Sequence, residues 1–542
     1  MNDYADRPVE VEAKFAVPTP KIFEELTKRK ITLAGYHFGP PVRKVVKDLY
    51  LDTTDFRLLR LGYQLRLRVG DAQWIMAVKS RAAANDVGIY RRLEIEEPLA
   101  DERCPECGGE LPGEIGEALA AVLDKRAKLA PVCVIEQTRT VFEMTATAPG
   151  HKRSSSQVLA LMSLDEMCIR QAVDDPLLAR AYEIEVELAR GIDVAELQVI
   201  ADRLIGAYGL VPSQASKLER SLAIISRHPA DSPESWQGLR REMPMAEACR
   251  AIWYEQLMLL LLNEAGARFS DDPEYVHDAR VSIRRARAAA RIYQAYFKPK
   301  AIRKHLKRLR RTARLFGAVR DLDVAIGKLQ QYQAKTRKKS AGDLQTTLDA
   351  WIAKRAATHA ELIEWLDSKQ YAEFVTDFLR FCRKPGAGVV DLRPAPGEEI
   401  TPFQLRHVAP TMLLANFASV RAYEMWFDMA DEVPVETLHR LRIACKYLRY
   451  NLEFMLSLLG PDGTEIVGLL RNLQDDLGDL NDAVVSSQMI TTGADEGASS
   501  LSQYEQTQEK LIARLRKQLR EDFARFVAEK NRARLLTAIA GL

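Results

Sequence analysis

The sequence predicts an α+β protein of two domains, in which a closed antiparallel β-sheet is followed by an all-helical domain of two related bundles. Three observations support this fold class. Apolar and charged residues alternate along several segments of the first 225 residues, the later residues have the pattern of helices rich in Leu, Ala and Arg, and one helical motif occurs twice. Alternation with a period of two is the signal of a strand with one buried face.

The alternating segments define the predicted strands of the first domain. They are residues 9–15, 64–69, 92–96 and 183–188, and short helices are expected between them at 20–29, 113–129 and 193–208. Residues i, i+2 and i+4 of a strand share one face, so Glu10, Glu12 and Lys14 lie together on one side of the first strand. A single strand of this kind is typical of a solvent-facing sheet, but four of them favour a closed sheet with a charged interior.

Composition and charge separate the two parts of the chain. The 542 residues are 47% hydrophobic and 28% charged, which is the balance of a globular protein, and the seven cysteines do not form a secreted disulfide framework. Residues 1–226 contain 30 basic and 34 acidic residues, whereas residues 227–542 contain 48 and 41. Between His277 and Arg320 there are 15 Lys and Arg residues and one acid, Asp278. Such a segment requires an anionic partner or buried counter-charges.

We expect two domains, at residues 6–225 and 239–542, joined by a linker at 226–238 that is rich in Ser, Pro and Gly. The start of the chain lacks the layout of a signal peptide. No window approaches the roughly 18 apolar residues that a membrane span needs. The prediction is therefore a cytoplasmic protein with no membrane partner.

A charged interior has a definite chemistry. Arginine and lysine side chains in a water-poor channel bind polyanions, and arginine matches phosphate oxygens with two parallel hydrogen bonds. Carboxylates from neighbouring strands would collect Mg²⁺ or Mn²⁺, which prefer oxygen ligands. Both kinds of side chain together predict a site for a metal ion and a polyphosphate, the combination that phosphoryl transfer uses.

The order of these residues resembles the CYTH domain family, the triphosphate tunnel metalloenzymes. The resemblance runs through Glu10-x-Glu12-x-Lys14, Asp48-x-Tyr50, Asp52-Thr53, Gly62, Arg66, Arg68, Lys79, Arg92-x-Glu94, Arg139, Asp165, Glu183-x-Glu185 and Ser216-Lys217-x-x-Arg220. It covers nearly all of residues 8–222 and implies an eight-stranded antiparallel tunnel open at both ends. Ala77 is a departure, because family members often carry Thr there.

The resemblance implies three overlapping groups of site residues. Phosphate-binding residues would be Lys14, Arg66, Arg68, Lys79, Arg92, Arg139, Lys217 and Arg220. Ligands of Mg²⁺ or Mn²⁺ would be Glu10, Glu12, Glu94, Asp165, Glu183 and Glu185. The catalytic set would be Glu10, Glu12, Lys14, Arg66, Lys79, Glu183 and Glu185. For Glu96 and Glu187, an outward orientation is an open alternative.

A cysteine pair, Cys104-Pro-Glu-Cys107, has the spacing of half a zinc site. A structural zinc site needs two further ligands. Cys133 and Cys168 do not form a second pair of this spacing. We therefore expect a loop with two thiols and no structural metal.

Basic residues of the second domain recur at helical spacing. The predicted basic faces are His277, Arg280, Arg284, Arg287 and Arg291, then Arg303, Lys307, Arg310 and Arg314, and finally His439, Arg442, Lys446 and Arg449. Intervals of three and four place each set on one face of a helix. Solvated helix faces mix charges of both signs, whereas these are almost wholly positive. The first and third sets repeat one motif about 160 residues apart, and Gly317 to Asp321 recurs as Gly478 to Asp482.

This repeated motif resembles the CHAD domain, from about residue 240 to the end of the chain. The resemblance implies two pseudo-symmetric four-helix bundles beside a basic groove that binds long-chain inorganic polyphosphate. Phosphate contact alone does not distinguish polyphosphate from nucleic acid. The basic helices lack interleaved exposed aromatic residues for base stacking, so nucleic acid is not expected as a partner.

The expected function is metal-dependent hydrolysis of inorganic triphosphate to diphosphate and phosphate, with polyphosphate binding by the helical domain and an association with polyphosphate granules. Two alternatives stay open. The protein could be a non-catalytic polyphosphate-binding or granule-targeting protein, although a pure anion binder gains nothing from carboxylates in its site. The tunnel could also act on an organic triphosphate such as thiamine triphosphate or ATP, although no Gly-rich loop or adenine-reading motif is present.

Overall fold

The structure is a computed structural model of the 542-residue chain. It describes residues 9–17, 20–28, 31–69, 73–80, 89–99, 111–124, 127–147, 154–171, 175–213, 215–227, 239–335, 341–392, 396–397, 399–429, 433–493 and 499–542. The pair Cys104 and Cys107 lies outside the described residues. The predicted linker 226–238 also lies outside them, apart from residues 226 and 227.

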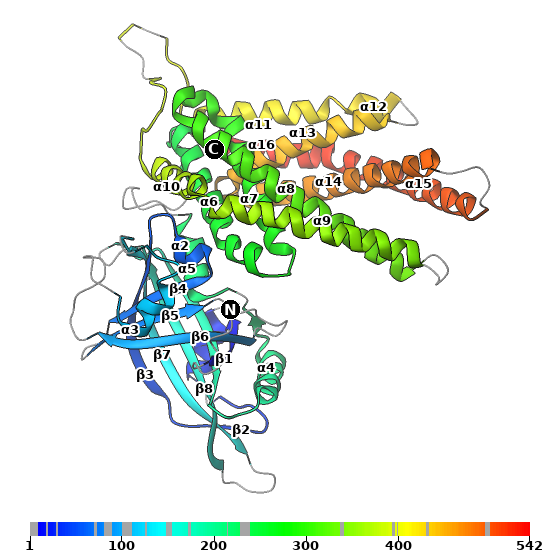
Figure 1. Ribbon diagram of the computed structural model, residues 1–542. Coiled ribbons are helices and arrows are strands. Elements are labelled where there is room, and N and C mark those ends of the chain that lie inside the picture. The colour runs from blue at the N-terminus through cyan, green and yellow to red at the C-terminus, as the bar shows by residue number, and fades with distance from the viewer. Residues whose placement is uncertain are drawn as a thin grey trace. The chain divides into compact units, whose positions relative to one another are not determined.

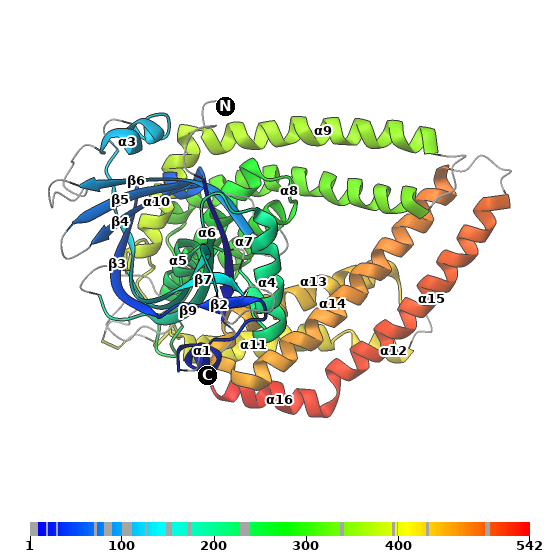
Figure 2. The ribbon, with the colours of Figure 1, turned by 90° about the horizontal axis from the view of Figure 1, so that it is seen from below.

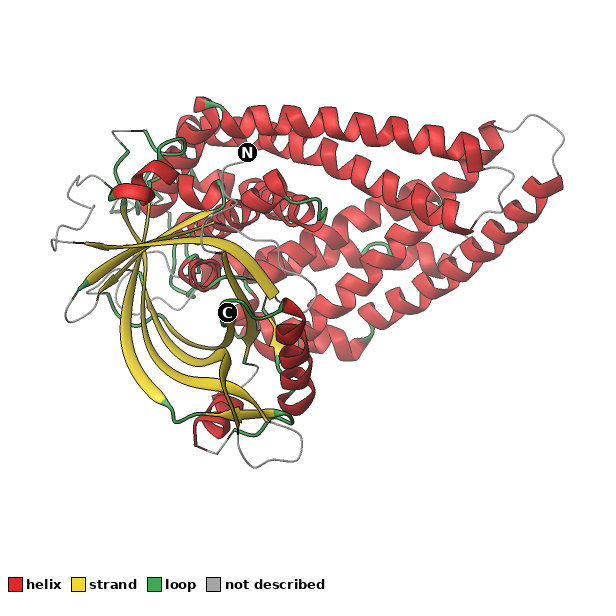
Figure 3. Cartoon of the chain, turned by 60° about the horizontal axis from the view of Figure 1, so that its bottom comes forward, coloured by secondary structure: helices red, strands yellow, loops and turns green. Residues whose placement is uncertain are grey.

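Eight strands of the first domain pair into a closed ring (Figure 3). They are β1 (Val9–Ala16), β3 (Val42–Asp52), β4 (Tyr63–Val69), β5 (Trp74–Ser80), β6 (Ile89–Leu99), β7 (Ala130–Thr147), β8 (Ser154–Arg170) and β9 (Ala179–Leu188). The order around the ring is β1, β6, β5, β4, β3, β7, β8 and β9, and β9 pairs again with β1. Two short strands, β2 (Tyr36–Phe38) and β10 (Val211–Pro212), pair with β7 and β1. All of these pairings are antiparallel.

Helices of the first domain lie around the ring (Figure 1). They are α1 (Pro20–Lys28), α2 (Arg57–Arg60), α3 (Gly113–Leu119), α4 (Val194–Tyr208) and α5 (Lys217–Ile225). Phe15 of β1 packs in one core with Phe23 of α1 and Ile200 of α4. Leu65 of β4 packs in a second core with Ile115 of α3. Apolar residues of these strands therefore pack outward against helices, which leaves the charged set to face the interior.

The three helices predicted in this domain are found as α1, α3 and α4. Asp193 is the N-cap of α4, and its side chain accepts a hydrogen bond from the Ala195 amide at 3.0 Å. The helix predicted at 113–129 is shorter, because α3 ends at Leu119. Val122 and Leu129 join the same apolar core from turns and extended backbone, so their burial does not require a longer helix.

The second domain is all-helical, which confirms the predicted fold class of an antiparallel β-domain followed by helices. Its helices are α6 (Met245–Phe269), α7 (Glu274–Tyr293), α8 (Pro299–Lys335), α9 (Ala341–Asp367), α10 (Lys369–Arg383), α11 (Leu405–Arg421), α12 (Glu424–Met429), α13 (Val435–Phe454), α14 (Leu456–Gly493), α15 (Ser499–Val527) and α16 (Glu529–Ala540), with a 3₁₀ turn at Gln294–Tyr296. Among the described helices, none is both long and apolar enough to cross a membrane.

The chain divides into two compact units. The first comprises Met1–Glu234, Tyr254–Arg284 and His305–Lys384, and the second comprises Ser235–Trp253, Arg285–Lys304 and Pro385–Leu542. In the first unit, the long helices α8 and α9 run antiparallel and side by side (Figure 2), and Arg355 donates to Asp323 across them at 2.9 Å. In the second unit, α14 packs against both α13 and α15.

Candidate active site in the tunnel

The strand register decides which side chains share the interior of the ring. Paired residues of an antiparallel sheet point to the same face, and alternate residues of one strand do so too. Lys14 of β1 is opposite Glu185 of β9, which is itself opposite Ser163 of β8. Across the ring, Tyr50 of β3 is opposite Arg66 of β4. Rows of inward-facing polar residues therefore run from strand to strand around the wall.

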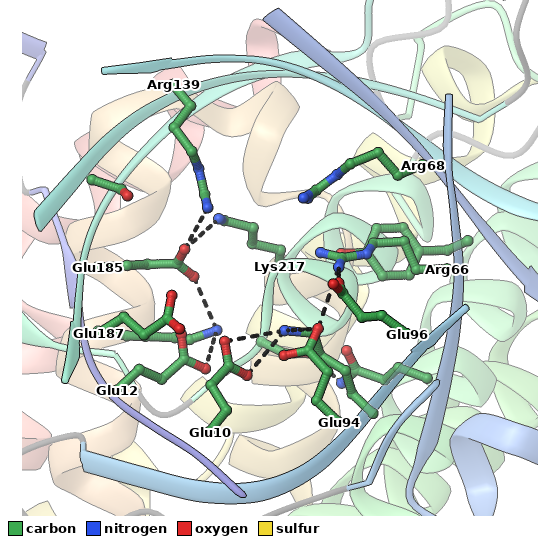
Figure 4. A pocket seen from close by; sticks show the side chains of 16 residues that line it. Glu10, Glu12, Arg66, Arg68, Glu94, Glu96, Arg139, Glu185, Glu187 and Lys217 are labelled. Atoms are coloured by element: carbon green, nitrogen blue, oxygen red, sulfur yellow. Dashed lines mark hydrogen bonds and ion pairs between the residues drawn. The ribbon is translucent and has the colours of Figure 1, made fainter. Parts of the chain in front are cut away.

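These rows enclose a cavity of about 210 Å³. Its lining residues are Glu10, Glu12, Lys14, Tyr50, Gln64, Arg66, Arg68, Lys79, Glu94, Glu96, Arg139, Ser163, Glu185, Glu187, Ser216 and Lys217. In Figure 4, the carboxylates of Glu10, Glu12 and Glu187 gather along one side, while Arg68 and Arg139 enter from the opposite side. The cavity thus has an acidic wall and a basic wall.

One group of ion pairs is centred on Lys79 and Arg66. Lys79 Nζ lies 3.0 Å from Glu10 and 2.8 Å from Glu94. Arg66 donates to Glu96 at 2.9 Å and to Glu94 at 3.3 Å. Arg66 Nε is buried and has no hydrogen-bond partner among the described residues. This guanidinium therefore retains a donor for an anion in the cavity.

A second group of ion pairs is centred on Glu185. Lys14 Nζ lies 3.1 Å from Glu185 and 3.2 Å from Glu12, and the Lys14 and Glu12 side chains are each 3% exposed. Arg139 donates to Glu185 at 2.5 Å and to Asp165 at 2.8 Å. Charges buried to this degree are stable only when opposite charges are this close. A phosphate group entering here would therefore exchange places with carboxylates as the partner of these cations.

Lys217 enters the cavity from the first turn of α5. Ser216, the N-cap, accepts a hydrogen bond from the Glu219 amide at 3.1 Å, and the Glu219 carboxylate accepts one from the Ser216 amide at 2.8 Å. This reciprocal capping box fixes where the helix begins. Lys217 Nζ then lies 2.5 Å from Asp165 and 2.9 Å from Glu185. The Ser-Lys-x-Glu sequence thus explains how a helix supplies a lysine to a cavity made of strands.

Neighbouring charges shift the carboxyl pKa values in opposite directions. Burial alone would raise the pKa of Glu185, but Lys217, Lys14 and Arg139 hold it well below its usual range. Burial raises the pKa of Glu94 to about 7, with Glu10 adding to this shift. Glu185 is therefore ionised at neutral pH, whereas Glu94 gains and loses its proton near neutral pH.

The acidic wall has an excess of negative charge that a cation would relieve. Burial raises the pKa of Glu187, and the neighbouring Glu10 and Glu12 raise it further. Deeper in the wall, Arg220 donates to one oxygen of Glu183 at 2.5 Å. The other oxygen, Oε1, is buried without a hydrogen-bond partner among the described residues, and Lys217 Nζ lies 3.6 Å from it. Mg²⁺ and Mn²⁺ prefer carboxylate oxygens as ligands, so these residues fit a divalent ion.

The tunnel carboxylates are nevertheless kept apart by the lysines between them. Within the described part of the chain, three ligand atoms within 4.8 Å of one another are found at Glu274, His277 and Asp278 of α7. That group lies at the surface and is far less enclosed than the tunnel. An ion in the tunnel would therefore replace lysine contacts such as that between Lys79 and Glu10.

Most of the predicted tunnel residues meet in this cavity. Those that line it are Glu10, Glu12, Lys14, Arg66, Arg68, Lys79, Glu94, Arg139, Glu185 and Lys217. Asp165, Glu183 and Arg220 lie behind the lining and bond to it or to one another. The backbone of Arg92 pairs with Glu10, but its side chain is outside the described residues. An outward orientation of Glu96 and Glu187 is wrong, because both line the cavity.

Four further lining residues received no site role from the sequence: Tyr50 and Ser216, which belong to the quoted motif, and Gln64 and Ser163, which do not. Gln64 stands two positions before Arg66, and Ser163 stands two positions before Asp165. The period of two along each strand was therefore the signal that would have found them. Gln64 donates to the Ser216 hydroxyl at 2.8 Å, which joins β4 to the start of α5.

The basic residues of α7 and α8 differ in their exposure and in their contacts. Those that lie exposed are Arg284, Arg287, Arg291, Arg303, Lys307, Arg310 and Arg314. Other arginines of α8 are bonded to neighbouring helices, since Arg308 donates to Glu373 at 3.0 Å and Arg311 lies over the Trp365 ring, 4.0 Å from its centroid. The exposed set is the one with the predicted spacing along α7 and α8.

Some predicted polyphosphate-binding residues also have structural contacts. Arg280 donates to the Gly317 carbonyl at 3.1 Å and to Asp321 at 2.5 Å. A Cβ added to Gly317 would lie 3.9 Å from Arg280 Nη1, and one added to Gly478 would lie 3.8 Å from Arg442 Nη2. The two copies of the motif thus place an arginine against a helical glycine in the same way.

The remaining members of the predicted basic faces lie on α7 and α13. His277 Nδ1 is 3.2 Å from Asp278, and Arg449 Nε is 3.9 Å from Glu453. His439 and Arg442 lie exposed, and Lys446 Nζ lies 5.9 Å from the centroid of the Tyr447 ring.

Comparisons with known proteins agree with this architecture. Residues 9–222 match the CYTH domain family, and residues 251–491 match the CHAD domain family. A candidate adenylate cyclase from Bacillus halodurans is 20% identical over 40% of this chain and 97% of that chain, with a TM-score of 0.28. The CHAD domain from the plant Ricinus communis is 22% identical over 56% of this chain and 94% of that chain, with a TM-score of 0.36.

An activity is described for another protein of similar structure. Protein HpAC1 from Hippeastrum, for which a dominant triphosphatase activity is described, is 20% identical over 39% of this chain and 93% of that chain, with a TM-score of 0.28. No curated protein matches the chain.

The antiparallel ring and its charged lining define the first domain as a tunnel of the CYTH type. The helices that follow carry the repeated basic motif of a CHAD domain. The chain therefore combines one domain of each family, CYTH at residues 9–222 and CHAD at residues 251–491. Membership of the CYTH family implies dependence on a divalent metal ion.

Proposed function

We propose that the tunnel hydrolyses inorganic triphosphate to diphosphate and phosphate with Mg²⁺ or Mn²⁺, and that the helical domain binds long-chain polyphosphate. One observation carries the tunnel proposal: six cationic and six carboxylate side chains line the same small cavity. A site that only bound anions would gain nothing from carboxylates. Phosphoryl transfer needs both, since cations hold the phosphates and oxygen ligands hold the metal ion.

In the proposed reaction, a water oxygen attacks the terminal phosphorus in line. The bond from that phosphorus to the bridging oxygen breaks, and diphosphate leaves with the electron pair. Arg66, Arg68 and Arg139 hold the phosphate oxygens, and Lys14 neutralises the charge that develops on them. The bound divalent ion supplies charge neutralisation and a water of lowered pKa. The proton that the water loses passes to a wall carboxylate such as Glu94, whose pKa is about 7, and then to solvent.

The lining supports an inorganic substrate over a nucleotide. Among the described residues that line the cavity, Tyr50 is the single aromatic side chain. Tyr50 is 5% exposed and opposes Arg66, so it offers little surface on which a base could stack. A triphosphate without a base satisfies the same cations and needs no apolar platform.

Phosphate release from triphosphate in the presence of Mn²⁺ tests the tunnel proposal. Glu10→Ala and Arg66→Ala are each expected to lower kcat/KM by at least about 100-fold, because each removes a charged group that contacts the metal ion or the substrate. Glu166→Ala and Arg180→Ala are matched controls, since these two residues form an exposed ion pair at 2.8 Å on the other face of β8 and β9. Full activity in Glu10→Ala and Arg66→Ala would contradict the proposal. Parallel assays with ATP and thiamine triphosphate test the organic alternatives.

The polyphosphate proposal for the helical domain rests on the exposed basic residues of α7, α8 and α13. These faces would hold the protein on polyphosphate granules. Arg284→Glu is expected to weaken binding of long-chain polyphosphate several-fold, because one phosphate contact becomes repulsive. Lys354→Glu, an exposed position on α9, makes the same change in charge and is expected to have little effect. Equal affinity in the two variants would mean that the basic face of α7 is only solvated.

A further inference from the structure

A buried cluster of charges connects α2 of the tunnel with helices α6 and α10, and all of its residues belong to the first compact unit. Glu264 on α6 is 0% exposed, and Arg60, the last residue of α2, is 5% exposed. Glu264 accepts hydrogen bonds from Arg60 Nε at 3.1 Å, from Arg268 Nε at 3.0 Å and from the Tyr371 hydroxyl at 2.8 Å. The Arg60 guanidinium also lies over the Tyr371 ring, 4.9 Å from its centroid.

The outer donors of the two arginines are bonded as well. Arg60 donates to Asp55 at 2.8 Å and to the Leu366 carbonyl at 3.0 Å. Arg268 donates to Asp367 at 2.7 Å. A buried network with this many bonds is rigid, because any displacement leaves a desolvated charge without its partner. The end of α2 is therefore fixed from the side of α6, α9 and α10.

Helix α2 directly joins two strands of the tunnel wall. The carboxylate of Asp52, the last residue of β3, accepts hydrogen bonds from two backbone N–H groups of α2, those of Leu58 and Leu59, both at 2.9 Å. It also accepts one from the Thr53 amide, before the helix, at 2.7 Å. At the other end, Leu61 and Gly62 separate Arg60 from the start of β4. Gly62 has φ +81°, a left-handed conformation that favours glycine and turns the chain into the strand. A force on Arg60 therefore acts on β4 through two residues.

Strand β4 carries two of the arginines that line the cavity. Arg66 is opposite Tyr50, and Arg68 is opposite Asp48 and donates to it at 2.8 Å. A change in where β4 begins would shift both guanidinium groups relative to the other cations of the wall. Displacements near 1 Å are enough to weaken a site that depends on several convergent groups.

We propose that Glu264 of the helical domain is a positioning residue for the tunnel, which acts through Arg60 to fix β4 and so to place Arg66 and Arg68 for a triphosphate. The expected effect on KM rests on the proposed function, whereas the expected effect on the mobility of β4 does not. It assigns to the helical domain a role in substrate binding by the tunnel that is separate from its own basic faces.

Amide hydrogen exchange in the full-length protein tests the structural consequence. In Glu264→Gln, the shape of the side chain is kept and its charge is lost, so exchange in peptides covering residues 63–69 should become at least about tenfold faster. Arg57→Gln is the matched control, because Arg57 is on the same helix but forms an exposed ion pair with Asp124 at 3.1 Å. Unchanged exchange in β4, or an equal increase in every strand of the ring, would overturn the proposal. If Glu264→Gln does not fold, Arg60→Lys, which keeps the charge, should give a smaller increase confined to β4.

Steady-state kinetics test the consequence for the substrate. Because Arg66 and Arg68 bind phosphate, Glu264→Gln should raise KM for triphosphate about fivefold and change kcat by less than about twofold. Arg60→Lys, which keeps the positive charge beside Glu264, should raise KM for triphosphate less than Glu264→Gln does. If the wild-type protein releases no phosphate from triphosphate, the proposed function fails. The exchange experiment then decides alone whether Glu264 fixes β4. If Glu264→Gln and Arg57→Gln have the same KM in an active enzyme, the positioning role fails and the proposed function stands.

Discussion

The charge on a tunnel side chain depends on the few groups in contact with it. Glu185 lies close to Lys14 and Lys217, and its pKa is well below the usual range. Glu94 contacts the same lysine as a second carboxylate, Glu10, and its pKa is about 7. Two glutamates that look alike in the sequence thus differ in charge at neutral pH. Three cations, Lys217, Lys14 and Arg139, offset the burial of Glu185, whereas Glu10 adds to the effect of burial at Glu94.

Glu94→Gln should change how stability depends on pH in the metal-free protein. The pKa of Glu94 is raised from 4.5 to about 7 in the folded chain. Its protonated form therefore stabilises the fold fully below pH 4.5, and this contribution is lost as the pH rises through 7. Between about pH 5 and pH 8 the loss amounts to about 2 kcal/mol, and a glutamine does not undergo it.

Urea unfolding in the presence of a chelator, repeated across that pH range, measures this difference. The free energy of unfolding of Glu94→Gln should fall less with rising pH than that of the wild type. Glu166→Gln, on the outer face of β8, is the control and should follow the wild type. Parallel curves for Glu94→Gln and the wild type would contradict the assigned pKa.

Whole elements supply groups that single strands do not. Helix α5 begins at a capping box and projects Lys217 into the cavity from its first turn. The long helices α8 and α14 carry a glycine where an arginine of the preceding α7 or α13 crosses them. In both cases a small local signal, a cap or a missing side chain, sets the position of a charged residue.

Ser216→Ala should weaken both the fold and the binding of substrate. The variant loses the cap on the Glu219 amide, which costs about 1 kcal/mol of stability. It also loosens the first turn of α5, so the KM for triphosphate should rise. Asp193→Ala removes the N-cap of α4, which does not line the cavity, and should cost similar stability without a change in KM. An unchanged KM in Ser216→Ala would show that the cap does not place Lys217.

Two helical glycines should respond in opposite ways to alanine. At Gly317, a Cβ would meet Arg280 Nη1 at an ordinary 3.9 Å, so Gly317→Ala should gain about 0.5 to 1 kcal/mol of stability from helix propensity. At Gly266, a Cβ would lie 2.2 Å from the Tyr275 ring, so Gly266→Ala should lose about 2 kcal/mol. Thermal unfolding of the two variants measures both effects. A change in stability of the same sign in both variants would mean that the distance from the added Cβ to its neighbour does not decide the effect.

The net charge of the molecule conceals two different electrostatic environments. The chain as a whole has a formal charge of +3 at pH 7. In the tunnel, cations and carboxylates are paired in a small enclosed cavity. On α7 and α8, basic side chains face solvent. Salt screens exposed charges strongly and buried pairs weakly, so the two proposed anion sites should respond differently to ionic strength.

Ionic strength should therefore separate the two proposed ligands. Between 50 and 300 mM salt, affinity for long-chain polyphosphate should fall by about 100-fold or more, because several exposed contacts release counterions. Affinity for triphosphate should fall by less than about tenfold over the same range, because salt screens the largely buried charges of the tunnel less strongly. Calorimetric titration of the wild-type protein with each ligand provides the comparison. Equal salt dependence would place both ligands on the exposed helical faces.

The sequence predicts the parts of this molecule that depend on local spacing. A period of two places Glu10, Glu12 and Lys14 on one face, and the structure has all three in the cavity wall. The same period does not say which face is inside, so the orientation of Glu96 stayed open until the register was known. The contact between Arg60 and Glu264 spans 204 residues, and no spacing rule relates them. Such contacts depend on how whole elements pack.

Closure of the ring has a consequence for folding kinetics. The first strand, β1, is hydrogen-bonded to β9, with Glu12 paired to Glu187, so closure of the barrel joins segments very distant in sequence. Chains dominated by distant pairings fold slowly, because a large loop must close before those contacts form. On the ribosome, β1 remains without this neighbour until β9 has emerged, and an uncovered strand edge promotes aggregation. Chaperone demand during synthesis should therefore be highest while β9 is still inside the exit tunnel.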